Sequence, residues 1–191
     1  KARNVGIIEN TGGLESPLES FIQTDAAVNS GNSGGALVDA SGSLIGIVTA
    51  IASGDGYYSG YSFAIPSNLA YKVVGDLQRY GYVQRAYLGV NVTELTAQSA
   101  RQHGLTQPKG IFVDRVVEDC AAARAGMRNG DILLKVNGVE VNSFALMMEE
   151  LGRFSPGEWV DLTYLRNGRQ YSTQAQLLNS RGTTEVIRPT R

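Results

Sequence analysis

The residues with the clearest chemical potential form the pentapeptide Gly31-Asn32-Ser33-Gly34-Gly35. A serine between glycines can occupy a tight bend that exposes its hydroxyl and brings neighbouring backbone N–H groups together. Such N–H groups stabilise the oxyanion of an acyl-transfer intermediate, and each donor contributes on the order of 3 kcal/mol. The pattern predicts a serine nucleophile at Ser33, although a glycine–serine turn without chemical function explains the pentapeptide alone equally well.

The same residues satisfy Gly-x-Ser-x-Gly, the nucleophile elbow of α/β-hydrolases. That elbow requires a helix directly after the serine. Here the short apolar run 36–38 reaches a turn at Ser41-Gly42, and the segment after it is β-branched. The sequence therefore disfavours a hydrolase elbow.

The base that would activate Ser33 is missing from the sequence. A serine hydroxyl is a weak nucleophile at neutral pH and needs a neighbouring base. The only histidine, His103, lies 70 residues after Ser33. Asp25 precedes the serine, but no histidine does, so the residues before Ser33 cannot complete a Ser-His-Asp triad and we expect a loop-ordering or structural role for Asp25. We expect the triad to be incomplete and the chain to be proteolytically inert by itself.

Composition limits the other function classes. The 191 residues include 23 glycines, which favours a turn-rich β fold over a helical bundle. The net charge of −1 provides no field that attracts nucleic acid. One cysteine, Cys120, and one histidine exclude a disulfide framework within the chain and a Cys- or His-rich metal site. We therefore expect no metal and no cofactor.

Both ends of the sequence suggest a piece of a longer protein. It begins Lys1-Ala2-Arg3 without methionine or a signal-like segment, and it ends on a polar stretch, 181–191. No apolar run approaches the roughly 18 residues that a membrane span needs.

The elements that must position the pentapeptide are short strands. Residues 1–84 carry four basic and seven acidic side chains, against thirteen and eleven in residues 85–191. The low charge and the apolar runs predict strands at 21–24, 36–38, 44–51 and 61–65. Ser67 is expected to be the N-cap of a helix that ends at Gly81. Its buried face is expected to contain Leu69, Ala70, Val73, Val74, Leu77 and Tyr80.

The second part of the chain combines strands with two predicted short helices. The helices are expected at 121–125 and 143–151, each ending before a glycine, with a strand at 131–136 between them. Asn167-Gly168 separates runs at 159–166 and 170–178 and predicts a hairpin.

Long segments of the sequence closely resemble the HtrA/Deg family, trypsin-like serine endopeptidases with one or two PDZ domains. The resemblance covers residues 18–178 and departs at Ser30, where many members carry proline. It rests on Phe21-Ile22-Gln23-Thr24-Asp25-Ala26-Ala27-Val28-Asn29 before the pentapeptide and on the runs 36–38, 44–50 and 63–67 after it. The implied fold is mainly β with α+β: the C-terminal barrel of a trypsin-like double β-barrel in 1–81, a PDZ domain in 82–179, and a linker or tail in 180–191.

The resemblance also implies roles around Ser33. Ser33 would be the nucleophile, and the backbone N–H groups of Gly31 and Ser33, with Asn32 between them, would form the oxyanion hole. The strand through Thr49, Ala50 and Ile51 would pair with the substrate backbone. Val28 and Ile51 would line an apolar pocket for the side chain before the cut, and ordinary core packing explains each of them equally well.

In the second part, Tyr87-Leu88-Gly89-Val90 resembles the carboxylate-binding loop of PDZ domains, and residues 121–127 and 130–133 match the family's PDZ signature. An extended peptide would add to the strand 90–92, and Gly89 would let the backbone approach its carboxylate. The helix 143–151 would form the opposite wall, with Met147 or Met148 and Leu151 lining an apolar pocket. We expect Leu88→Glu to abolish peptide binding without affecting folding.

The implied partners are unfolded polypeptides, peptide C-termini, an N-terminal barrel absent from this chain, and further copies in a trimer or a multiple of it. The implied location is the periplasm or cell envelope, with a role in protein quality control under stress. The alternative is a non-catalytic PDZ peptide-binding module on a degenerate protease half-domain. Histidine and aspartate encoded before Lys1 would decide between the two hypotheses.

Overall fold

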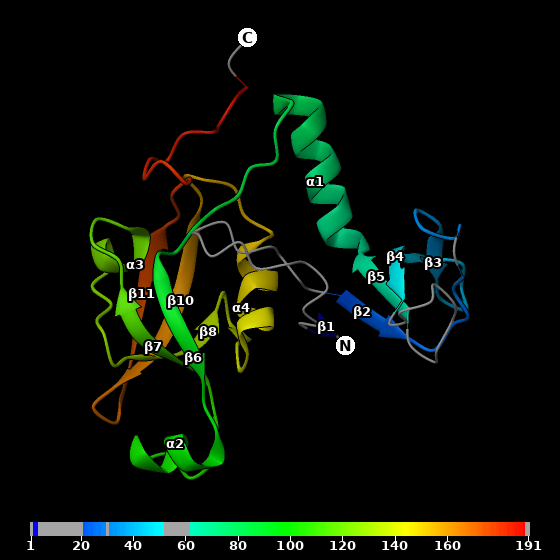
Figure 1. Cartoon of the computed structure of the whole chain (residues 1–191). Helices are drawn as coiled ribbons and strands as arrows, with labels where there is room; N and C mark the ends of the chain where they lie inside the picture. The colour runs from blue at the N-terminus through cyan, green and yellow to red at the C-terminus, as the bar shows by residue number, and fades with distance from the viewer. Residues whose placement is uncertain (1, 4–20, 30, 52–61, 190–191) are drawn as a thin grey trace. The chain divides into compact units, whose positions relative to one another are not determined.

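The computed structural model describes residues 2–3, 21–29, 31–51 and 62–189, and the chain divides into two compact units, 1–81 and 82–191 (Figure 1). The first unit is a five-stranded antiparallel sheet in the order β1-β2-β5-β4-β3. Its strands are β1 (Ala2–Arg3), β2 (Phe21–Thr24), β3 (Ala36–Val38), β4 (Leu44–Ile51) and β5 (Ser62–Pro66).

Strand β4 organises this sheet, because it pairs with both β3 and β5. The β4–β5 register shifts between Val48 and Ala50, so Thr49 is an extra residue on β4. Phe21 and Phe63 pack under the sheet with ring centroids 6.2 Å apart. The sequence therefore predicted β2, β3, β4 and β5 to within one residue, whereas it did not predict the two-residue β1.

Helix α1 (Ser67–Tyr80) follows β5 and differs from its prediction in two respects. Pro66, with extended backbone angles, occupies the cap position, and Ser67 is the first helical residue without a side-chain cap. The buried position is Asp76, whereas Val74 and Leu77 are about half exposed. The apolar stripe is wider than the face that the helix buries, so the expectation for those two residues was wrong. Gly81 ends the helix in the left-handed conformation, as predicted.

The second unit is built on an antiparallel sheet in the order β11-β10-β8-β7-β6, with β9 paired to β8. Its strands are β6 (Val90–Glu94), β7 (Ile111–Val116), β8 (Ile132–Val136), β9 (Val139–Glu140), β10 (Trp159–Arg166) and β11 (Arg169–Gln176). Its helices are α2 (Ala97–Gln102), α3 (Ala121–Arg124) and α4 (Phe144–Leu151). Together the two units confirm a mainly β architecture with α+β character.

The β10–β11 hairpin forms as its turn residues predict. Asn167 and Gly168 both have positive φ, 49° and 75°, which is the conformation that matches strand twist in a two-residue turn. Helices α3 and α4 also form where the sequence predicts them. Helix α2 was not predicted, because it is six residues long and has no apolar period.

A buried ion pair connects the hairpin to the rest of the second unit. Asp131 is 1% exposed, and its carboxylate accepts hydrogen bonds from Arg166 Nε at 2.7 Å and Nη2 at 2.8 Å. The bond to Asp131 raises the pKa of Arg166. Arg166 also lies over the Tyr164 ring, 5.0 Å from its centroid, so the guanidinium is held from several sides.

The segment after β11 folds back onto the start of the second unit. The Gln84 side chain, 1% exposed, donates to the Ile187 carbonyl at 2.7 Å and accepts from the Ile187 N–H at 2.7 Å. Asn179 is similarly buried and accepts from the N–H groups of Arg181 and Thr183. The sequence placed residues 180–191 in a linker or tail; up to Ile187, they contribute contacts to the second unit. None of the helices in the described ranges combines the length and apolar character needed to cross a bilayer.

Candidate active site and peptide-binding groove

The loop that carries Ser33 consists of two tight turns between β2 and β3. The N–H of Asn32 donates to the Asn29 carbonyl at 3.0 Å, and the N–H of Gly35 donates to the Asn32 carbonyl at 2.9 Å. A side chain at position 35 would place its Cβ 2.9 Å from the Asn32 oxygen, so the second turn needs glycine. Ser33 lies inside this second turn and is exposed. Ser30 lies outside the described residues.

Strand β4 holds the loop in place. The N–H of Gly34 donates to the Val48 carbonyl at 2.8 Å, and the N–H of Val48 donates to the Gly35 carbonyl at 2.9 Å. These two bonds anchor the glycines that follow Ser33, so the position of the serine depends on β4.

Two backbone donors beside the Ser33 hydroxyl remain unused. Among the described residues, the N–H groups of Gly31 and Ser33 have no acceptor, whereas those of Asn32, Gly34 and Gly35 are all bonded. Gly31 has a φ of +98°, which few residues other than glycine adopt. Unpaired N–H groups next to an exposed hydroxyl can receive a negatively charged oxygen.

Ser33 also lies against the extra residue of β4. Its Oγ is 3.5 Å from the Thr49 carbonyl oxygen, at the long limit of a hydrogen bond. Thr49 is the residue that the register shift leaves out of the β4–β5 ladder. The serine hydroxyl and the bulge of β4 therefore meet.

The other sequence-predicted residues of this unit are only partly described. Val28 is 7% exposed, which fits a pocket wall and a core residue equally well. Ala50 and Ile51 belong to β4, but their side chains lie outside the described residues. Ser62, which the sequence did not single out, is fully buried, and its Oγ donates to the Ala26 carbonyl at 3.0 Å and so fixes the segment before the loop. No sequence motif marks that role.

His103 has a local role in the second unit. It ends helix α2, and its ring stacks on Phe112 of β7 with centroids 4.4 Å apart. Across the described residues there is no group of three or more His, Cys, Asp or Glu side chains that could hold a metal ion.

The predicted carboxylate loop connects three elements of the second unit. Tyr87 exchanges backbone hydrogen bonds with Leu178, the Leu88 carbonyl accepts from Ala122 at 2.8 Å, and the Gly89 carbonyl accepts from Val117 at 2.9 Å. The N–H groups of Leu88 and Gly89 have no acceptor within the described ranges. The carbonyl groups of this loop are therefore hydrogen-bonded, whereas two adjacent N–H groups have no partner among the described residues.

The backbone angle at position 89 and the close approach of Cys120 both require glycine there. Its φ is +80°, and a Cβ built on it would lie 2.1 Å from the Cβ of Cys120. Cys120 is the residue before α3, and its side chain makes no capping hydrogen bond. It fills the space beside the loop.

Leu88 and the predicted helix residues belong to the hydrophobic core. Leu88 is 2% exposed, Met147 2% and Leu151 3%, and all three are in one buried cluster. The expectation that Leu88→Glu spares folding was therefore wrong, because a carboxylate at that position would enter the core. Phe144 and Met148 are half-buried on α4 and pack against the same cluster, so they are partly accessible apolar side chains of the helix, as is the half-buried Leu146.

An open strand edge lies beside this helix. Strand β6 is the last strand of its sheet, it pairs only with β7 within the described ranges, and α4 contacts it (Figure 1). The sequence analysis missed one residue here: Glu94, at the end of β6, accepts a hydrogen bond from the Phe144 N–H at 2.9 Å. The unpaired edge, the loop donors and α4 together can bind an extended peptide by strand addition.

Comparisons with known proteins agree with this division. Residues 86–177 match the PDZ domain family, and residues 3–47 match the trypsin-like peptidase domain family. The chain is 42% identical over 168 residues to the "Probable periplasmic serine protease do/HhoA-like" of Haemophilus influenzae, covering 88% of this chain and 36% of that protein. It is 42% identical over 162 residues to the "Periplasmic serine endoprotease DegP" of Escherichia coli K12, covering 85% and 34%.

Solved structures give the same result. The chain is similar to the structure titled "HtrA-type protease AlgW with decapeptide", with a TM-score of 0.63 and 44% identity over 89% of this chain and 52% of that one. The corresponding structure with a tripeptide gives a TM-score of 0.64 and 44% identity over 88% and 56%. The chain spans about a third of the length of the curated relatives that it matches.

Proposed function

Because this chain belongs to the HtrA/Deg family of serine proteases, we propose that it is the part of such a protease that carries the nucleophile and one PDZ domain. Ser33 attacks the scissile carbonyl, and the N–H groups of Gly31 and Ser33 receive the oxyanion. The observation that carries this proposal is that the N–H groups of Gly31 and Ser33, next to the exposed Ser33 hydroxyl, have no acceptor among the residues that the structure describes. Each such donor supplies about 3 kcal/mol of transition-state stabilisation.

The general base comes from outside these 191 residues. A serine nucleophile needs a neighbouring base, and the only histidine of the sequence is engaged with Phe112 in the second unit. A histidine and an aspartate before Lys1 would complete the triad in the order that trypsin-like enzymes use. Val38 and Leu44, which are 51% and 47% exposed, support an apolar partner surface on this unit, as a missing N-terminal barrel would provide.

Substrate is held along β4. The strand through Thr49, Ala50 and Ile51 pairs with extended backbone, and Val28 with Ile51 selects a small aliphatic side chain before the cut. Extended binding suits unfolded polypeptides, which expose such segments. The names of the relatives support a periplasmic location. A role in protein quality control is part of this proposal because the family resemblance implies it. A trimer, or a multiple of it, remains part of this proposal.

The second unit binds peptide C-termini. The N–H groups of Leu88 and Gly89 bind the terminal carboxylate, the peptide adds to the open edge of β6, and Phe144 and Met148 of α4 line the groove beside the buried Met147 and Leu151. This activity depends on elements of the second unit alone, so it is separable from catalysis.

Cleavage of a reduced, unfolded protein tests the catalytic proposal. We expect the longer polypeptide encoded with the preceding segment to cleave it, and the 191-residue chain to leave it intact. Ser33→Ala should abolish cleavage, whereas Ser172→Ala, an exposed serine on β11, should not change it. Ser33-dependent cleavage by the 191-residue chain would contradict the external base, and cleavage by the Ser33→Ala variant would reject the nucleophile.

Peptide titration tests the second unit independently. A ten-residue peptide ending in valine with a free carboxylate should bind the 191-residue chain, and the same peptide with a C-terminal amide should bind at least about tenfold more weakly, because charge-assisted hydrogen bonds contribute about 1.5–3 kcal/mol. Equal affinities in calorimetry would reject the carboxylate loop.

A further inference from the structure

Glu94 joins the strand and the helix of the groove at the end far from the carboxylate loop. Its Oε1 accepts from the N–H of Phe144, the first residue of α4, at 2.9 Å. Ser143 completes the helix start by accepting from the Leu146 N–H at 3.2 Å. A carboxylate at a helix N-terminus is favourable, so this contact places the start of α4 beside the end of β6.

The contact also fixes which peptide residue reaches Glu94. A peptide whose carboxylate lies at Leu88 and Gly89 extends along β6 from Val90 towards Glu94. Val90 and Val92 are half-buried against the core while Asn91 and Thr93 are exposed, so Glu94 follows Val90 and Val92 on the groove face. Directly opposite residues of antiparallel strands share a face. With the last peptide residue opposite Val90, the fifth residue from the peptide C-terminus lies opposite Glu94.

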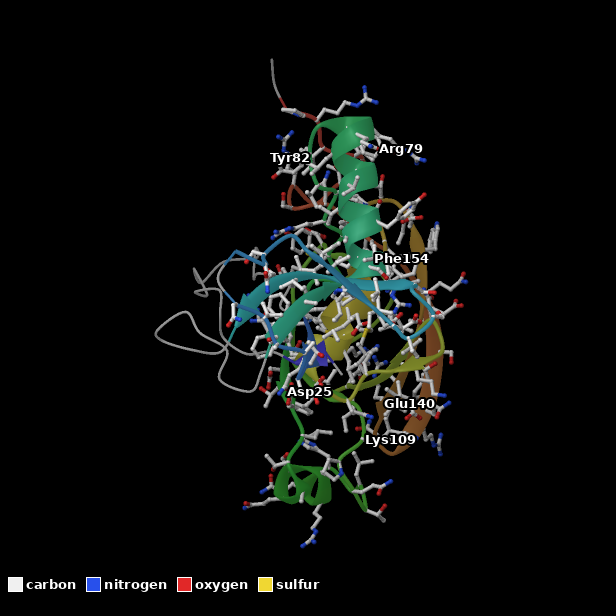
Figure 2. The ribbon with its side chains drawn as sticks, turned by 90° about the vertical axis from the view of Figure 1, so that its right-hand side faces the viewer. Asp25, Arg79, Tyr82, Lys109, Glu140 and Phe154 are labelled. Carbon is white, nitrogen blue, oxygen red and sulfur yellow. The ribbon has the colours of Figure 1, made fainter. Side chains whose placement is uncertain are left out.

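The charge of Glu94 is not neutralised by its surroundings. Its side chain is exposed, and Oε2 has no partner in the part of the chain that the structure describes. Lys109, in the connection between β6 and β7, is instead paired with Glu140 at 3.5 Å (Figure 2). The backbone N–H of Phe144 is a neutral donor and leaves the carboxylate with its negative charge.

We infer that Glu94 is a specificity-determining residue that selects lysine or arginine at the fifth position from the peptide C-terminus. The inference rests on the proposed peptide-binding function of the second unit. A cation at that position pairs with Oε2 while Oε1 keeps its bond to Phe144. An anion at that position is repelled.

Titration of the 191-residue chain with three peptides tests this inference. The probes are ten-residue peptides ending in valine that carry lysine, alanine or glutamate at the fifth position from the C-terminus. The lysine peptide should bind about 2- to 5-fold more tightly than the alanine peptide, because exposed charge pairs contribute about 0.2–1 kcal/mol. The glutamate peptide should bind most weakly, and the differences should shrink at high salt.

Glu94→Gln removes the negative charge but keeps the contact with the helix, because the glutamine side-chain oxygen still accepts from the Phe144 N–H. It should bind all three peptides equally. Glu185→Gln is the matched control, since it removes one exposed negative charge elsewhere in the same unit and should keep the preference. Equal binding of the three peptides by the unsubstituted chain, or a preference that survives in Glu94→Gln, overturns the inference alone. Binding of none of them overturns the peptide-binding function as well.

Discussion

Gly89 and Cys120 occupy the same small volume in the second unit. A side chain at position 89 would overlap the Cys120 Cβ at 2.1 Å and would also strain a backbone φ of +80°. We therefore expect Gly89→Ala to lower the free energy of unfolding of this unit by about 2–4 kcal/mol, as the sum of overpacking and backbone strain. Urea unfolding followed by the fluorescence of Trp159, the only tryptophan, measures it.

Gly138→Ala is the matched control for this change. Gly138 has a φ of +79° but nothing within 4 Å of its built Cβ, so alanine there adds strain without a contact. Gly138→Ala should lower the free energy of unfolding clearly less than Gly89→Ala does. Equal losses would show that the contact with Cys120 costs nothing and that strain alone keeps glycine at position 89.

At the residue scale, the two candidate sites share one structural feature. Gly31 and Ser33 in one unit, and Leu88 and Gly89 in the other, have N–H groups without an acceptor in the described ranges. In each pair a glycine with positive φ turns the backbone outwards. In the proposed function, each pair of backbone donors would bind a charged oxygen, an oxyanion in the first site and a carboxylate in the second.

At the scale of elements, local chemistry determined what the sequence could predict. Asn167-Gly168 dictates its turn whatever surrounds it, so the β10–β11 hairpin was predictable. Helix α2 depends on a capping box in which Thr96 and Ser99 exchange hydrogen bonds, and serine at the third helical position is a weak signal.

The sequence pattern could not predict contacts between residues that lie far apart in the chain. The apolar residues of α1 predict a buried face, but the pattern does not specify which part of the wide stripe the sheet covers, and Val74 and Leu77 are left exposed. Glu94 and Phe144 are 50 residues apart, so their hydrogen bond required the fold. The Ser33 pentapeptide was identifiable because its residue types are contiguous in the sequence, although its anchoring to β4 is long-range.

Helix α4 contains a carboxylate that is unfavourable when ionised. Burial raises the pKa of Glu150, Arg153 at 3.2 Å opposes that shift, and Glu149 adds to it. A raised pKa in the folded state gives stability that is present below the ordinary carboxyl pKa and is lost as the pH rises through the folded value. Glu150→Gln cannot ionise, so it should raise the urea midpoint at about pH 7 and have no advantage at about pH 3.

Glu185→Gln, at an exposed position, should not reproduce this pH-dependent gain. A lower urea midpoint for Glu150→Gln at neutral pH would mean that the ion pair with Arg153 outweighs the burial of the charge. In that case Arg153→Met would be expected to destabilise α4 by a similar amount, because it leaves Glu150 with a buried charge.

At the scale of the whole molecule, the two units have separate interiors. The buried cluster of Leu88, Val113, Leu133 and Leu162 lies entirely within residues 82–191, and Phe21 and Phe63 pack within the first unit. The two candidate sites are divided in the same way: Ser33 lies in one unit and the proposed peptide groove in the other. A substitution in the interior of one unit is therefore expected to leave the unfolding midpoint of the other unchanged, because residues that share no partners behave additively.

The second unit depends on a contact between its first and last segments. Gln84 bonds both backbone groups of Ile187 and donates to the Tyr82 carbonyl at 2.9 Å, all from a side chain that is 1% exposed. Gln84→Glu has the same shape but loses the amide donor and introduces a buried charge. We expect it to lower the free energy of unfolding of this unit by about 1–3 kcal/mol at neutral pH.

The loss should diminish as the pH falls through the carboxyl range, because a protonated glutamate is neutral and regains one donor. Gln107→Glu, at an exposed position of the same unit, makes the same chemical change without these partners and should leave the Trp159-detected transition in place. A pH-independent loss in Gln84→Glu would indicate that the shape of this contact matters more than its hydrogen bonds. No loss would show that residues 180–187 lie on the second unit without stabilising it, and would assign them to the linker that the sequence predicts.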